Sequence, residues 1–88
     1  MLKRKATAGT EEGSDVLVTI EPGEKGIEIQ LDSVVAGSFG EAIKRTILEM
    51  LEEFQIEDCK VIMRDSGALD STIRARLETA ILRACEEV

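Results

Sequence analysis

Alternation of apolar and polar residues marks the first part of the chain. The mostly β-branched run at 16–20 predicts a strand. Residues 26–32 alternate strictly, with Ile27, Ile29 and Leu31 on one side and polar residues on the other, which predicts a second, half-buried strand. The proline and glycines between the two runs are typical of a turn. The two strands are therefore expected to form an antiparallel hairpin.

Two amphipathic helices follow, with a third strand between them. Apolar residues recur every three or four positions from Phe39 to Phe54 and again from Leu69 to Ala84. The run at 59–63 predicts the strand. Ser38 to Glu41 has the form of a capping box, and Asp70 or Ser71 is expected to cap the second helix.

The order β-β-α-β-α predicts an α+β fold with a small mixed sheet and both helices packed on one face. The helix between the second and third strands allows these strands to pair in parallel. Residues 1–15 lack periodicity and are expected to form a flexible N-terminal arm. Residues 16–88 are then a single domain.

Size and charge narrow the range of partners. The chain has 88 residues, and 43% are hydrophobic, which fits one small folded domain. Three of its 11 basic residues lie among the first five, so the remainder carries eight basic against 18 acidic residues, a net charge of −10. This charge argues against nucleic acid and anionic membranes as partners and favours basic protein surfaces. No apolar run is long enough to span a membrane or to serve as a signal peptide, and a cytoplasmic location is expected.

The residue types that are missing restrict the chemistry. The chain has no histidine, tryptophan or tyrosine, so a Ser-His-Asp or Cys-His nucleophile system is excluded within it. Cys59 and Cys85 match no metal or redox spacing and are interpreted as reduced core thiols. No phosphate-binding glycine motif is present. A metal site, a catalytic site and independent enzymatic activity are therefore not expected.

The stretch AGTEEGSD, residues 8–15, contains one serine, Ser14. A carrier protein needs a primary hydroxyl on an uncluttered segment, and Ser14 next to Gly13 meets that need. The alternative interpretation is that Ser14 and Asp15 only shape the entry to the first strand. The residues by themselves leave both interpretations open.

Several motifs together resemble those of the acyl carrier protein, or gamma subunit, of citrate lyase. The resemblance covers nearly the whole chain and includes Ala8-Gly9-Thr10, Ser14-Asp15-Val16, Phe39-Gly40 and Thr46-Ile47. Its most specific part is Gly67-Ala68-Leu69-Asp70 followed by Ile73-Arg74-Ala75-Arg76-Leu77-Glu78.

The resemblance implies a non-catalytic carrier subunit. It implies a covalently attached 2'-(5''-phosphoribosyl)-3'-dephospho-CoA arm, whose thiol carries an acetyl or citryl group while citrate is cleaved to oxaloacetate and acetate. The implied partners are the alpha and beta subunits of citrate lyase, a prosthetic-group transferase and an acetylating ligase. The carrier of malonate decarboxylase, and an unmodified interaction module that only assists assembly, are the alternatives.

One departure from the family pattern concerns the attachment site. The family usually reads Glu-Ser-Gly-Asp or Glu-Ser-Ser-Asp and carries the arm on the serine two residues before the aspartate. Gly13 stands at that position here, and Ser14 follows it. We therefore expect Ser14 to be the attachment residue, with the secondary hydroxyl of Thr10 as a poorer candidate.

Arg74 and Arg76 on the last helix point about 200° apart, so they cannot form one clamp. Arg74 is expected to pair with Glu78 at i,i+4 spacing. The alternative to such surface pairing is that one arginine steadies the phosphates of the arm or contacts another subunit.

Overall fold

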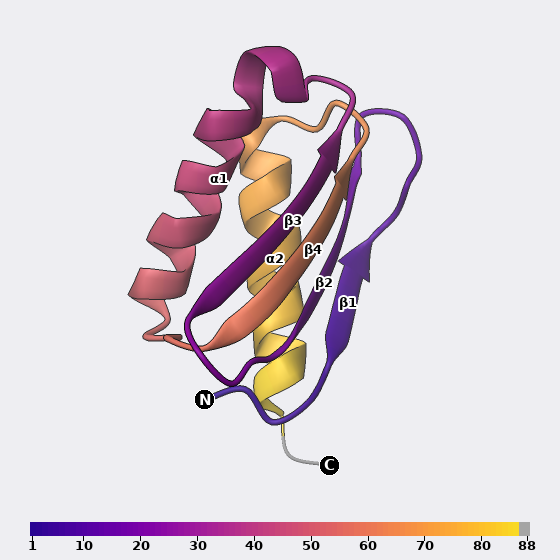
Figure 1. The fold of residues 1–88 in the computed structure, drawn as a ribbon. Coiled ribbons are helices and arrows are strands. Elements are labelled where there is room, and N and C mark those ends of the chain that lie inside the picture. Colours follow the sequence, from indigo (N-terminus) through magenta and orange to yellow (C-terminus); the bar gives the residue numbers. More distant parts are fainter. Residues whose placement is uncertain (87–88) are drawn as a thin grey trace.

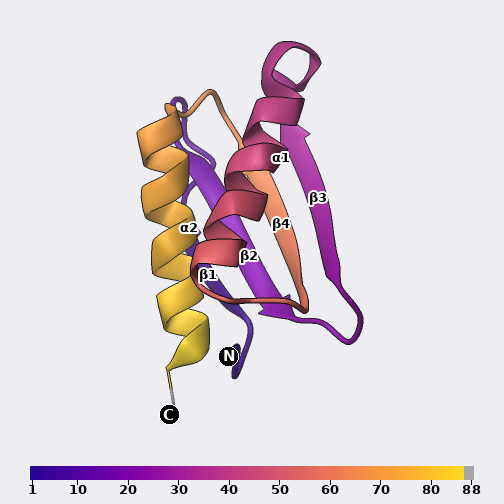
Figure 2. The same ribbon diagram turned by 90° about the vertical axis from the view of Figure 1, so that its left-hand side faces the viewer.

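The computed structural model describes residues 1–86 as one four-stranded sheet covered by two helices. The strands are β1 (Ala6–Gly9), β2 (Val16–Pro22), β3 (Ile27–Ser33) and β4 (Cys59–Asp65), and the helices are α1 (Ala36–Glu53) and α2 (Asp70–Cys85). Both helices lie on the same face of the sheet, as Figures 1 and 2 show. The expected α+β class and the one-sided packing are confirmed.

The sheet order is β1-β2-β4-β3, with β4 antiparallel to β2 and parallel to β3. The expected hairpin between the strands at 16–20 and 26–32 is therefore wrong, because β4 lies between them. The parallel pairing of β3 and β4 across α1 is confirmed. The central position suits β4, where Cys59, Val61 and Met63 are buried on one side and Ile62 is half-buried on the other.

The expected order β-β-α-β-α lacked one strand. Residues 6–9, inside the segment expected to be an arm, form β1 and pair antiparallel with β2 from Ala6↔Ile20 to Gly9↔Leu17. Ala8 is buried against the core. The observed order is β-β-β-α-β-α. The boundary between an arm and a domain at residue 15 stays a prediction.

The core lies between the sheet and the helices. The inward side chains of β2 and β4 meet the apolar stripes of both helices, and the largest fully buried ones are Ile20, Ile47, Leu51, Met63, Leu77 and Ile81. Their burial removes apolar surface from water, which is the main driving force for packing the two layers. The expected apolar faces of the two helices are confirmed except at three residues, since Phe39 is 58% exposed, Leu69 is 73% exposed, and Ala42 is exposed as well.

The expected helix caps are wrong. α1 begins at Ala36, two residues before the proposed capping serine, and its N-cap Val35 makes no side-chain hydrogen bond. α2 begins at Asp70 after the N-cap Leu69, which makes none either. Asp70 instead uses its carboxylate between the helices, accepting from the Thr46 hydroxyl at 3.0 Å and from Arg74 Nε at 2.7 Å.

Candidate functional site

The candidate site lies at the end of the sheet where the β1–β2 loop, the β4–α2 connection and the start of α1 come together (Figure 1). Ser14 is exposed in the β1–β2 loop. Its backbone N–H donates to Ser66 O at 2.8 Å. Within residues 1–86 its hydroxyl makes no hydrogen bond, so a primary alcohol is left free on a segment whose backbone is fixed.

Ser14 has φ +66°, in the left-handed region that favours glycine. Gly13 does not have a positive φ, and a Cβ built on it would meet no atom within 4 Å. In the Glu-Ser-Gly-Asp pattern of the resemblance, glycine would occupy the left-handed position. This chain places serine there and glycine at the unstrained position before it.

Asp15 holds the loop to α2. Its carboxylate accepts from Arg76 Nη2 at 2.9 Å and from Arg76 Nε at 3.1 Å, a two-bond arrangement that fixes both groups. The Thr10 hydroxyl donates to the same carboxylate at 2.7 Å, and so does the N–H of Val16. The hydrogen bonds from Arg76, and then those from Thr10 and Val16, hold the pKa of Asp15 well below its usual range.

A second set of contacts ties the loop to the end of β4. Ser66 N–H donates to Asp15 O at 2.9 Å, and the Ser66 hydroxyl donates to Glu11 O at 3.1 Å. Arg64 pairs with the Glu11 carboxylate at 3.0 Å. The candidate attachment residue therefore lies beside the turn that leads into α2.

Asp65, at the end of β4, holds the β4–α2 turn in place. It is 3% exposed, accepts from the Ser33 hydroxyl at 2.7 Å and accepts from Ala68 N–H at 2.9 Å. A buried carboxylate needs such partners, because an unpaired one is strongly penalised. The aspartate thus joins the ends of β3 and β4 to the segment that precedes α2.

Gly9 is required where the loop begins. It has φ +92°, and an added Cβ would lie 1.8 Å from Val16 O and 3.3 Å from Arg76 Cδ. A side chain there would collide with the backbone of Val16 and crowd the arginine that holds Asp15.

Arg74 and Arg76, in the first half of α2, make different contacts. Arg74 does not pair with Glu78 as expected; it pairs with Asp70 at 2.7 Å and Glu49 at 3.5 Å, so it joins the two helices. Its hydrogen bond lowers the pKa of Asp70. Arg76 reaches the β1–β2 loop, a contact that sequence reasoning missed. Arg76 and Asp15 are 61 residues apart in the sequence. The family-like motif that contains Arg76 was the only sign in the sequence that this arginine has a particular role.

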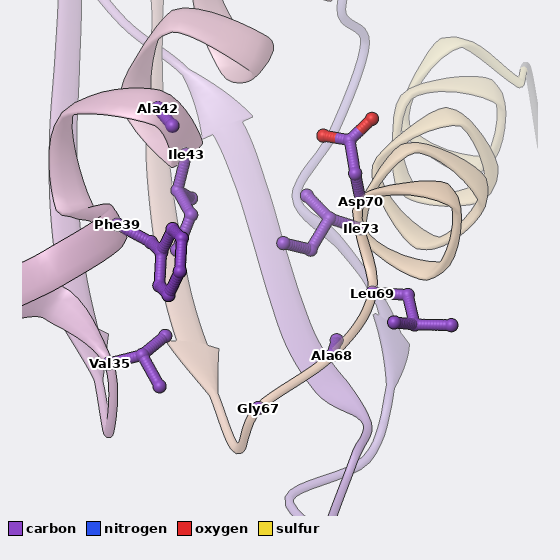
Figure 3. Close-up of a pocket in the computed structure, with 9 residues that line it drawn as sticks. All are labelled: Val35, Phe39, Ala42, Ile43, Gly67, Ala68, Leu69, Asp70 and Ile73. Carbon is purple, nitrogen blue, oxygen red and sulfur yellow. The ribbon is translucent and has the colours of Figure 1, made fainter.

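An apolar cleft of about 370 Å³ opens next to the site. Val35, Phe39 and Ile43 line it from the α1 side, and Ala68, Leu69 and Ile73 line it from the α2 side (Figure 3). Gly67, which follows the Ser66 that bonds Ser14, also lines it. Phe39 is exposed because its ring lines this open cleft, whereas the Leu69 side chain points away from Phe39 (Figure 3).

The two cysteines and the remaining acidic residues do not form a second candidate site within residues 1–86. Cys59 is buried and free, and burial raises the pKa of its thiol to about 11, while Cys85 is free and half-buried. The described residues contain no group of three potential metal ligands. Among residues 1–86, no helix has the length and apolar character needed to cross a membrane.

Comparisons with known proteins agree on a family. The family model ACP, described as malonate decarboxylase delta subunit (MdcD), matches residues 3–84. A citrate lyase acyl carrier protein from Treponema denticola is 48% identical over 86 residues, which cover 98% of each chain. One from Serratia proteamaculans is 49% identical over 94% of this chain and 82% of its own length. A chain in the crystal structure of a Pseudomonas malonate decarboxylase hetero-tetramer in complex with malonate has the same fold, with a TM-score of 0.67, 24% identity and coverage of 93% of this chain and 84% of its own.

Proposed function

The chain belongs to the family of citrate lyase acyl carrier proteins and malonate decarboxylase delta subunits, and from this we propose that it is the acyl carrier subunit of a citrate lyase. It carries an acetyl or citryl thioester on a prosthetic group while other subunits cleave citrate to oxaloacetate and acetate. The choice of citrate lyase rests on the curated relatives, which at 44–49% identity bear that name. The carrier of malonate decarboxylase is the alternative, favoured by the description of the family model.

The family implies a covalently attached prosthetic group, and we propose phosphoribosyl-dephospho-CoA linked through a phosphodiester to Ser14. The observation that carries this assignment is the exposed hydroxyl of Ser14, which makes no hydrogen bond within residues 1–86 and stands on a backbone held to Ser66. The thiol of the bound group supplies the site of thioester formation. Asp15, Arg76 and Thr10 hold the loop so that the hydroxyl faces solvent and the modifying enzyme.

No side chain of the carrier needs to take part in bond cleavage. Its contribution is to tether the thioester, which gives the acyl group a high effective concentration at successive active sites. The proposed partners are the alpha and beta subunits of the lyase, the prosthetic-group transferase and the acetylating ligase. The net charge of −10 beyond the first five residues supports docking onto basic surfaces of these proteins.

Intact mass measured on the chain from active complex of its native host tests the proposal. We expect one added phosphoribosyl-dephospho-CoA, mapped to the peptide that contains residues 8–15. An unmodified chain in active complex would refute the carrier function and favour an interaction module that only assists assembly.

Four variants locate the attachment. Ser14→Ala should abolish modification, whereas Ser38→Ala, at an exposed serine on α1, should leave it unchanged. The exchange Gly13→Ser with Ser14→Gly should restore modification at position 13, because that position is open and glycine relieves the positive φ of position 14. A Ser14→Ala chain that still gains the arm would refute Ser14, and Thr10→Val combined with Ser14→Ala would then test the threonine.

A further inference from the structure

The apolar cleft beside Ser14 has no occupant from the described part of the chain. Its walls come from the first turns of α1 and from the segment 67–73, and its volume of about 370 Å³ lies at the small end of the range for ligand pockets. It therefore suits a group of the size of one ring system, and it is too small for a whole coenzyme.

The walls suit an uncharged, flat group. Among residues 1–86, the one charged residue that lines the cleft is Asp70, and Arg74 and Thr46 already donate hydrogen bonds to its carboxylate. Phe39 is 58% exposed at the cleft and is one of two aromatic residues in the chain. An exposed aromatic ring costs free energy in water, and it offers a face on which a heteroaromatic ring stacks.

The position of the cleft identifies the occupant. Ser14 N–H bonds Ser66 O at 2.8 Å, and the next residue, Gly67, already lines the cleft. A group attached to Ser14 thus begins its path within a residue or two of the opening. In the arm of the proposed function, the adenine lies close to the serine linkage, and the thiol lies at the far end.

We propose that the cleft between Phe39 and Ile73 binds the adenine ring of the prosthetic arm. The inference rests on the proposed function. Binding of the adenine fixes the base of the arm on the carrier and leaves the thioester end free to reach other subunits. Only the serine-proximal part of the arm is held in this way. The thioester end therefore stays mobile, but it moves only within the space around this end of the sheet.

Nuclear magnetic resonance of the full chain, with and without the arm, tests this. The loaded chain is produced in its native host, which supplies the arm and the enzymes that attach it, and its mass is checked first. We expect the methyl signals of Ile43, Ile73 and Ala68 to shift on loading, and nuclear Overhauser effects to join adenine protons to these methyls and to the Phe39 ring. The readout needs no other subunit and no activity.

Phe39→Ala and Leu48→Ala form the matched pair. Both residues are exposed apolar residues on α1, but Leu48 lies outside the cleft. Phe39→Ala should reduce the bound population of adenine, measured from the shifts, by about fivefold or more, the effect of losing one stacking partner. Leu48→Ala should leave it unchanged.

The outcomes separate the two proposals. A chain that carries no arm in active complex from the native host overturns the proposed function and this inference together. A loaded chain in which the adenine stays mobile, or in which the pantetheine methyls contact the cleft instead, overturns only the inference. Loss of binding to the alpha or beta subunit in Phe39→Ala, without any shift of cleft methyls on loading, would identify the cleft as a subunit interface and also overturn it.

Discussion

The two ends of the sheet are closed in different ways. At one end, the loop 10–15 is held by side chains from distant elements, above all by Arg76 of α2 on Asp15. At the other end, the β2–β3 loop is held by the residues around the start of β4. Gly26 N–H donates to Asp58 Oδ1 at 2.7 Å, and Cys59 N–H donates to Gly26 O at 3.0 Å. The first end is held by a half-buried ion pair, Arg76–Asp15, and an exposed one, Arg64–Glu11, around an exposed hydroxyl. The second end is packed tightly against backbone.

This difference indicates what each end is suited for. Gly23 at the second end would bring a Cβ to 2.9 Å from Cys59 N, so no group can be added there without movement. Gly13 at the first end has open space around it. A loop that must accept a large group benefits from fixed anchors and an open tip, and the first end has both.

The largest effect is expected from Gly9→Ala. The new Cβ would collide with Val16 O at 1.8 Å in a left-handed backbone, so β1 must move. We expect the free energy of unfolding to fall by roughly 3 kcal/mol or more. Urea denaturation measures it, with Gly13→Ala as the control, for which a change within about 0.5 kcal/mol is expected. Equal effects of the two substitutions would contradict the close approach at Gly9.

Gly23→Ala should lower the free energy of unfolding by a smaller amount, roughly 1–3 kcal/mol. The new Cβ would overpack against Cys59, but position 23 does not have a positive φ. The substitution should also expose the Cys59 thiol, whose pKa burial raises to about 11. In the unaltered protein at pH 8, alkylation should modify Cys85 and spare Cys59. Mass mapping after timed alkylation measures both, and rapid modification of Cys59 in the unaltered chain would count against its burial.

Replacing Arg74 and Arg76 of α2 one at a time sharpens the comparison. Arg76→Gln should speed amide hydrogen exchange across residues 10–16 several-fold, because Asp15 loses its two-bond partner. Arg74→Gln should leave that loop unchanged, since the ion-pair partners of Arg74 within residues 1–86 are Asp70 and Glu49. If both variants loosened the loop alike, the assignment of Arg76 as its anchor would fail.

The smallest effect is expected from lowering the pH, which changes the stability contribution of Asp15 and the amide signals of its loop. The pKa of Asp15 is lowered in the folded state, so its ionised form stabilises the fold above the usual aspartate pKa of about 4, and this contribution is lost as pH falls below that value. The amide signals of Ser14 and Val16 should therefore stay constant from pH 7 to about pH 4 and shift only in stronger acid. In Asp15→Asn the acid shift should vanish, and a midpoint near pH 4 in the unaltered chain would disprove the ion pair's effect.

Periodic segments were predictable because their pattern is local. The apolar stripe of α2 from Ile73 to Ala84 is buried as its spacing predicts, and strict alternation marks β3. β1 was missed because Ala6 to Gly9 has neither alternation nor bulk, so only hydrogen bonds to β2 make it a strand. The helix starts were missed because capping motifs were expected at Ser38 and at Asp70 or Ser71, whereas the helices begin without side-chain caps.

For this protein, the sequence by itself determined the layers, most of the apolar face of each helix and the excess of acidic residues, and it offered Ser14 as a candidate for attachment. Periodicity states which side of an element is apolar, but not which element it will meet. Tertiary structure decided that β4 separates β2 from β3, that Arg76 holds Asp15 across 61 residues, and that Phe39 lines a cleft beside Ser14 instead of the core. Those contacts depend on how the layers close in space, which no local pattern encodes.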